Sequence, residues 1–127
     1  MAHLWRGVIR EYAERLPMLE GAPIVTLQEG GTPLIPAEHL SELTGAQVYV
    51  KYEGLNPTGS FKDRGMTTAM SVAAKHGAKA VICASTGNTS ASAAAYATKA
   101  GMACGVRVAT GANTSPPRPL VAEAYSV

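Results

Sequence analysis

A short apolar run at residues 80–84, Ala-Val-Ile-Cys-Ala, constrains the fold more than any other feature. An uninterrupted run of this kind is typical of a strand covered on both faces, as in a parallel sheet. A helix is expected before it, from about Phe61 to His76, and an alanine-rich helix after it, from Ala91 to Ala100. Met102 to Val108 is a second apolar run and is predicted to be the next strand.

A further strand is predicted upstream, where Gln47 to Glu53 alternates in polarity and is rich in β-prone residues. The resulting order, β, loop, α, β, loop, α, β, is typical of parallel strands with right-handed crossovers. We therefore predict an α/β fold with a partial doubly wound parallel sheet. Loops after such strands open at the same edge, where these sheets bind ligands, so Lys62 and Asn88 would share one crevice.

The first part of the chain is predicted to hold shorter elements. His3 to Leu16 carries an apolar stripe at helical spacing, and Pro17 ends it. Ile24 to Leu27 is predicted to be a short strand, and Ala37 to Leu43 a short helix closed by Gly45. Two adjacent glycines in the loop between them indicate backbone freedom or close approach to another group.

The segment from Asn56 to Gly65 carries the most reactive candidate, Lys62. Turn residues precede the helix, and Thr58 or Ser60 could cap it. Lys62 would then lie in the positive potential of free backbone N–H groups, which favours a neutral amine able to form a Schiff base with an aldehyde. Spacing alone favours a simpler interpretation, a solvated surface lysine or an anion contact.

A second candidate site is the loop from Ser85 to Ser90, which supplies hydroxyls, an amide and a glycine at the start of a helix. Helix N-termini bind anions through backbone N–H groups, so a carboxylate or phosphate would suit this loop. The alternative is an ordinary βα turn whose N-cap region has several polar side chains and binds no ligand.

Composition excludes several classes of protein. The chain has 127 residues, 46% hydrophobic and 16% charged, with a net charge of +2, as in a soluble globular domain. It has no basic run with interleaved aromatics, so nucleic-acid binding has no support. Cys83 and Cys104 are predicted to be reduced core residues, and the histidines lack metal-ligand spacing. We expect no membrane association, and a cytoplasmic location by default.

Four motifs, in order and at matching spacing, resemble one enzyme family: Glu29–Leu34, Val50–Leu55, Asn56–Gly65 and Ala84–Ala93. Across residues 5–104 the chain resembles pyridoxal-phosphate-dependent enzymes of fold type II, in the form typical of threonine synthases. The resemblance implies pyridoxal 5′-phosphate as cofactor and O-phosphohomoserine as the small-molecule substrate, converted with water to threonine and phosphate. It also implies that full-length relatives are homo-oligomers.

The resemblance also implies roles for single residues. Lys62 would carry the cofactor as a Schiff base and move protons at the substrate. Asn88 would hydrogen-bond the 3′-oxygen of the cofactor ring. The substrate carboxylate would be bound by Ser85, Thr86 and Thr89, and Thr89 would also reach the substrate phosphate.

Two alternatives to a threonine synthase stay open. One is a serine or threonine dehydratase-like enzyme with the same cofactor, which Asn56-Pro57 and Asp63-Arg64 argue against because dehydratases usually lack them. Asp63 and Arg64 are expected to position the helix. The other alternative is a non-catalytic α/β fragment with a binding role.

The chain departs from the family in two ways. It has no counterpart of the family's Gly-rich loop that grips the cofactor phosphate. Residues 1–106 are predicted to be the N-terminal part of the enzyme, and residues 107–127 a divergent tail rich in Pro, Gly and Ser, from a frameshift or truncation. We therefore expect the chain alone to be inactive, with apolar faces left uncovered.

Overall fold

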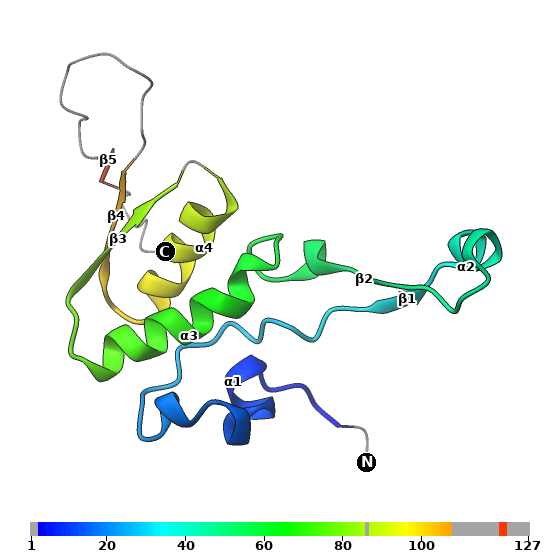
Figure 1. The fold of residues 1–127 in the computed structure, drawn as a ribbon. Helices are drawn as coiled ribbons and strands as arrows, with labels where there is room; N and C mark the ends of the chain where they lie inside the picture. The colour runs from blue at the N-terminus through cyan, green and yellow to red at the C-terminus, as the bar shows by residue number, and fades with distance from the viewer. Residues whose placement is uncertain (1–2, 86, 108–119, 122–127) are drawn as a thin grey trace.

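The computed structural model describes residues 3–85, 87–107 and 120–121 (Figure 1). Its helices and strands are α1 (Val8–Glu11), β1 (Leu34–Pro36), α2 (Glu38–Thr44), β2 (Tyr49–Lys51), α3 (Lys62–Lys75), β3 (Ala80–Ala84), α4 (Asn88–Lys99), β4 (Ala103–Arg107) and β5 (Leu120–Val121). Short 3₁₀ turns occur at Ala13–Arg15, Pro17–Leu19 and Glu53–Leu55. Within this described part, no helix has the length and apolar character needed to cross a bilayer.

The central unit is β3–α4–β4. The two strands pair in parallel, with Val81 opposite Cys104, and β5 adds to β4 in the antiparallel direction. Helix α4 packs on both β3 and β4, and α3 packs on α4 (Figure 1). This arrangement confirms the predicted α/β class and the predicted parallel pairing of residues 80–84 with the apolar run that follows α4.

The hydrophobic core lies where α3 and α4 meet beneath this sheet. Tyr96 and Ala97 of α4 are fully buried, and Met70 of α3 packs with them. Val25, from the segment before β1, completes this contact. The half-buried cysteines predicted for the core, Cys83 and Cys104, pack against this cluster as free thiols. Burial, and next the nearby Cys83, raise the pKa of Cys104 above its usual range.

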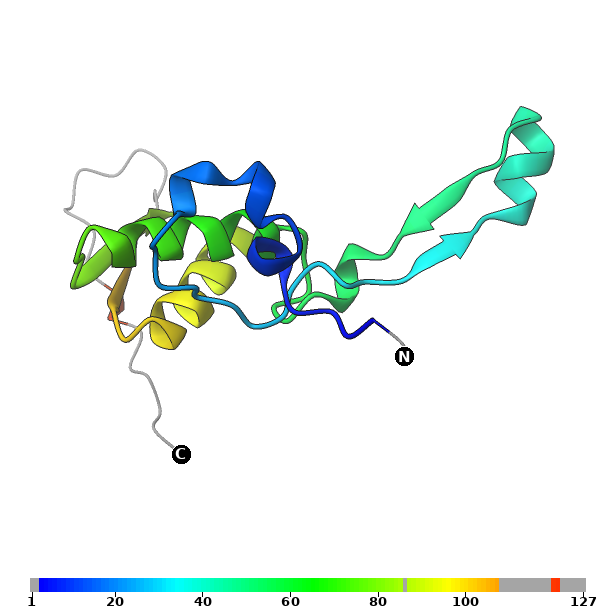
Figure 2. The same cartoon turned by 90° about the horizontal axis from the view of Figure 1, so that it is seen from below.

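The prediction that residues 47–53 form a strand of the parallel sheet is wrong. β2 instead pairs with β1 in a separate antiparallel sheet, with Ile35 opposite Val50. The two strands and α2 between them form an arm that projects from the body (Figures 1 and 2). Alternating polarity shows that a segment is β-prone, but it does not specify the partner or the direction of pairing.

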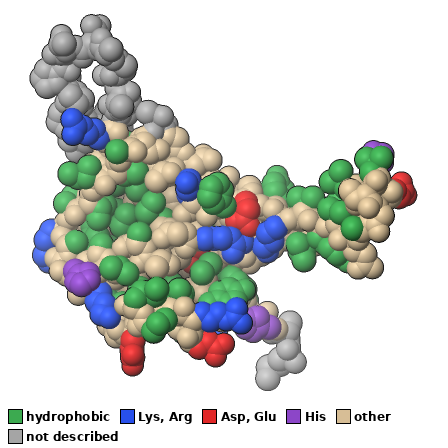
Figure 3. All heavy atoms as spheres, viewed as in Figure 1, with side chains coloured by type: hydrophobic (Ala, Val, Ile, Leu, Met, Phe, Trp, Pro, Cys, Tyr) green, Lys and Arg blue, Asp and Glu red, His purple; other side chains and the backbone are tan. Residues whose placement is uncertain are grey.

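The prediction that residues 80–84 are covered on both faces is also wrong here. Val81 and Cys83 face the core, whereas Ile82 on the other face is 82% exposed. Large hydrophobic side chains are also exposed along the arm, as Figure 3 shows. The arm's exposed members include Leu34, Ile35, Leu40, Leu43, Tyr49 and Val50.

The opening segment is not the single helix predicted for residues 3–16. Gly7 has a φ of 93°, and only Val8–Glu11 is α-helical. The Glu11 carboxylate accepts the Arg6 N–H at 3.1 Å, so a side chain takes the place of a helical carbonyl before the first turn. An apolar stripe at helical spacing cannot reveal this competition.

The strand predicted for Ile24–Leu27 does not form within the described sheets. The Val25 N–H donates to Ser71 Oγ at 2.9 Å, and the Val25 carbonyl accepts from Thr67 Oγ1 at 2.6 Å. Side chains of α3 thus satisfy the backbone groups that a neighbouring strand would otherwise pair.

Candidate functional site

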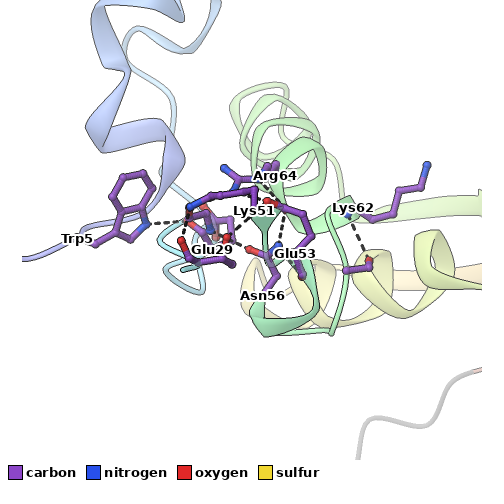
Figure 4. A network of polar contacts seen from close by, with 10 residues as sticks. Trp5, Glu29, Lys51, Glu53, Asn56, Lys62 and Arg64 are labelled. Carbon is purple, nitrogen blue, oxygen red and sulfur yellow. Dashed lines mark hydrogen bonds and ion pairs between the residues drawn. The ribbon is translucent and has the colours of Figure 1, made fainter. Parts of the chain in front are cut away.

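Lys62 is the first residue of α3, one residue after the predicted start at Phe61; Phe61 itself is the N-cap and provides no side-chain cap. The Lys62 N–H donates to Ser60 Oγ at 3.3 Å, so Ser60 contributes to the start of the helix. The Lys62 side chain is half-buried, and its Nζ lies 4.8 Å from the centre of the Phe61 ring. Figure 4 shows the amine pointing away from the polar network on the other side of this turn. Within the described residues the amine therefore takes no part in that network.

The second loop opens α4. Asn88 is the first residue of the helix and is exposed, and Thr89 beside it is half-buried. The Gly87 N–H donates to the hydroxyl of the half-buried Ser85 at 3.2 Å, and Ser90 Oγ donates to the Gly87 carbonyl at 2.7 Å. Thr86, predicted to bind substrate, lies outside the described residues. The loop thus gathers amide and hydroxyl groups at a helix N-terminus, the pattern expected for anion binding.

A buried carboxylate joins the two helix starts. Asp63 is fully buried and accepts hydrogen bonds from the Thr58 N–H at 2.7 Å and from Ser92 Oγ at 2.5 Å. Ser92 lies four residues after Asn88, and residues with that spacing share a helix face. The first turn of α3 therefore contacts the face of α4 that begins with Asn88. A helix-to-helix contact, not the predicted common sheet edge, relates Lys62 to Asn88.

A second network links three of the sequence motifs (Figure 4). The Arg64 guanidinium forms two hydrogen bonds to the Glu53 carboxylate, at 2.7 and 2.8 Å, and donates to the Gly30 carbonyl at 3.0 Å. Asn56 donates to Glu53 at 2.8 Å and accepts the Gly30 N–H at 2.9 Å. Nearby, the Lys51 ammonium donates to the Thr32 carbonyl.

The pairing of Arg64 with Glu53 shifts the pKa of both side chains. The hydrogen bonds from Arg64 are the largest cause that holds the pKa of Glu53 below its ordinary value. The same bonds raise the pKa of Arg64. The network is therefore a fully charged bidentate pair near neutral pH, and it fixes the segment that leads to Lys62.

Glu29 forms a third network, which sequence reasoning missed. It is fully buried and accepts the backbone N–H groups of Val8 and Leu27, each at 3.1 Å. The Tyr96 hydroxyl donates to its carboxylate at 2.8 Å. Burial is the main cause that raises the pKa of Tyr96, with the Glu29 hydrogen bond and charge next. Nothing in the sequence pairs Glu29 with a tyrosine 67 residues away.

Gly31 shows what the adjacent glycines do. A Cβ at Gly31 would lie 2.8 Å from Trp5 Cγ, so the backbone approaches the indole closely. Trp5 Nε1 also donates to the Glu29 carbonyl at 2.8 Å. The glycines thus accommodate protein packing. A cavity of about 280 Å³ beside them is lined by Trp5, Gly30, Gly31, Thr32, Asn56 and Pro57 among others, and by none of the described candidate site residues.

The residues at the two helix starts fit pyridoxal phosphate in part. Lys62 offers an amine, and Asn88 offers an amide that can donate to a ring oxygen. Hydroxyls and N–H groups around Gly87 can donate hydrogen bonds to a carboxylate. Within residues 3–85 and 87–107 no Gly-rich loop adds a separate phosphate grip. The chemistry of the described residues therefore suits the aldehyde and ring oxygen of such a cofactor better than its phosphate.

Comparisons with known proteins give the family of the chain. The family described as "Pyridoxal-phosphate dependent enzyme" matches residues 25–125. The threonine synthase of Halalkalibacterium halodurans is 58% identical over 107 residues, 84% of this chain and 30% of that protein. That of Synechocystis is 63% identical over 100 residues, 77% of this chain and 26% of that protein. The chain thus spans about 30% of the length of these relatives.

A solved structure gives a further match. The processed form of threonine deaminase isoform 2 from Solanum lycopersicum has a TM-score of 0.62 and 28% sequence identity. The match covers 84% of this chain and 30% of that one.

Proposed function

The chain belongs to the pyridoxal-phosphate dependent enzyme family, and from this membership we propose that it is the N-terminal part of a threonine synthase. The proposed reaction converts O-phosphohomoserine and water to threonine and phosphate. The observation that carries it is the identity of 58–63% to threonine synthases, over a stretch that includes both helix starts.

Each described site residue has a proposed role. When bound, pyridoxal phosphate supplies an aldehyde that captures amines and a ring that withdraws electrons from the substrate α-carbon. Lys62 holds the cofactor through its amine and moves protons at the substrate α- and β-carbons. Asn88 donates to the ring 3′-oxygen. The hydroxyls of Ser85 and Thr89 bind the substrate carboxylate.

Thr86 is proposed for the same carboxylate from its place in the sequence between Ser85 and Gly87. Residues outside this chain would supply the phosphate grip, and homo-oligomer formation is proposed for the full-length enzyme. The chain alone should show no turnover, because so much of the relatives' length has no counterpart here.

A dehydratase is the second candidate, since the solved threonine deaminase shares this fold. Its identity of 28% is about half that of the threonine synthases. The pair Asp63-Arg64, which dehydratases usually lack, also favours the first candidate.

A chimera separates the two candidates. Residues 5–104 of this chain would replace the matching segment of the Halalkalibacterium halodurans threonine synthase. We expect phosphate release from O-phosphohomoserine, absent in the Lys62→Ala chimera, and no 2-oxobutanoate from threonine. A folded chimera that deaminates threonine and leaves O-phosphohomoserine intact would overturn the proposal in favour of the dehydratase.

A further inference from the structure

Asp63 follows Lys62 directly, yet its side chain does not pair with the lysine. The ion pairs within the described residues involve Glu11 and Glu53 as the acidic partners, and Asp63 is in none of them. The Lys62 amine instead lies over the Phe61 ring, while Asp63 is fully buried. Any influence of Asp63 on Lys62 therefore does not pass through an ion pair between the two side chains.

The contacts of Asp63 converge from two directions. Thr58, in the loop before α3, donates its N–H to Oδ2 at 2.7 Å and its hydroxyl to Oδ1 at 2.5 Å. Ser92, fully buried on α4, donates its hydroxyl to Oδ1 at 2.5 Å. Hydrogen bonds to a buried carboxylate are among the strongest neutral-donor bonds in proteins, and their geometry is restrictive.

The position of Ser92 gives these bonds a functional consequence. It lies one helical turn after Asn88 on the same face of α4. Fixing Ser92 to Asp63 fixes the Asn88 end of α4 relative to the first turn of α3, where Lys62 lies. We propose that Asp63 is a positioning residue, which clamps the lysine-bearing turn of α3 to α4 through Ser92 and so sets Lys62 relative to Asn88. This inference rests on the proposed function of those two residues.

Ser92→Ala tests the clamp by removing one donor and leaving the Thr58 bonds intact. Ser71→Ala is the matched control, because Ser71 is also fully buried but lies on α3, nine residues from Lys62, and bonds to the Val25 N–H. Both changes cost stability through a lost buried hydrogen bond. Only the first loosens the contact beside Lys62.

The first measurement is the rate at which pyridoxal phosphate, trapped by borohydride, labels Lys62 relative to Lys75 on the surface of the intact chain. We expect Ser92→Ala to lower this relative rate about tenfold, since fewer molecules hold the competent geometry. Ser71→Ala should leave it within about twofold at matched fractions of folded protein. Equal losses in both variants would reduce Asp63 to a stabilising residue and overturn the proposal.

A second measurement does not depend on the cofactor. Spin labels on Lys62→Cys and Asn88→Cys, in a Cys83→Ala/Cys104→Ala background, report the distance between the two positions. The distribution of distances between the two spin labels should broaden with Ser92→Ala and stay narrow with the control Ser71→Ala. An unchanged distribution would overturn the clamp, even if the wild-type chain labels well.

These two measurements separate the clamp from the proposed function. If wild-type Lys62 shows no preference for pyridoxal phosphate, the proposed function fails, whereas the spin-label distances still decide the clamp. Asp63→Asn adds a double-mutant cycle with Ser92→Ala. Since the two residues act through one bond, the double variant should broaden the distance little more than Asp63→Asn alone. Fully additive effects would contradict action through Ser92.

Discussion

Tyr96→Phe removes a single hydroxyl from the core of the protein. That hydroxyl donates to Glu29 at 2.8 Å, and both residues are fully buried. A hydrogen bond to a charged group contributes about 1.5–3 kcal/mol. The backbone N–H groups of Val8 and Leu27 still bind the carboxylate, so it is not left without partners. We therefore expect a loss near the lower end, about 1.5–2 kcal/mol in the free energy of unfolding.

Urea unfolding followed by circular dichroism measures this loss. Tyr49→Phe is the control, because Tyr49 is 53% exposed on the arm, and a surface change of this kind costs less than about 0.5 kcal/mol. The midpoint for Tyr96→Phe should fall by about 1 M urea with an unchanged slope. Equal midpoints for the two variants would refute the buried tyrosine–carboxylate bond.

The same variant has a pH signature. Burial and Glu29 raise the pKa of folded Tyr96, whereas the unfolded phenol has its ordinary pKa of about 10. Above that pH the unfolded chain loses a proton that the folded chain keeps. The Tyr96 hydroxyl therefore contributes fully to the free energy of unfolding below pH 10. As the pH rises above 10, this contribution falls by about 1.4 kcal/mol per pH unit. Wild type and Tyr96→Phe should converge near pH 11 to 12, and a constant gap would contradict this reasoning.

Three further predictions concern packing and the charged network. Arg64→Lys loses the two-bonded pairing with Glu53 and should cost about 1–2 kcal/mol in urea unfolding. Since the pairing lowers the pKa of folded Glu53, its stabilisation is present above pH 4–5 and lost on acidification, so the variant should lose less stability between pH 6 and 3 than wild type. Met70→Ala opens the core and should cost about 2–5 kcal/mol, measured in the same way. Gly31→Ala displaces Trp5, the single tryptophan, so its fluorescence should shift to the red; an unshifted spectrum would contradict the close approach.

Much of the central fold could be predicted from the sequence. The apolar run at residues 80–84 coincides with β3, and the parallel pairing with β4 was expected from the helix between them. Gly45 closes α2 in the left-handed conformation, as its position predicts. These features are local, since each depends on periodicity, capping or the length of one connection.

Several of the errors concern which segments pair with each other. The β-prone segment at β2 pairs with β1 rather than with β3, and Val25 bonds to side chains of α3 rather than to a strand. Both segments carry the residues of a strand, and only tertiary contacts decide their neighbours. The relation of Lys62 to Asn88 was likewise predicted from a shared sheet edge, whereas the contact between Asp63 and Ser92 provides it.

In the candidate site too, local features could be predicted from the sequence, whereas long-range contacts could not. The start of α3 lies within one residue of its predicted start at Phe61, whereas α4 begins at Asn88, three residues before the predicted start at Ala91. Asp63 was expected to position the helix, but its bond to Ser92 was not predicted, and Glu29 was given no role, because both acids bond to groups far along the chain. Ser92 carried one usable signal, its spacing of four residues from Asn88.

The most direct test of the central claim is to ask where pyridoxal phosphate attaches. The purified chain would be incubated with the cofactor, reduced with borohydride, digested and mapped by mass spectrometry. The pyridoxyl group should lie mainly on Lys62, with little on the other lysines, Lys51, Lys75, Lys79 and Lys99, and Asn88→Ala should weaken that preference. Equal labelling of all the lysines, or a preference that Asn88→Ala leaves unchanged, would contradict a cofactor site at the paired starts of α3 and α4.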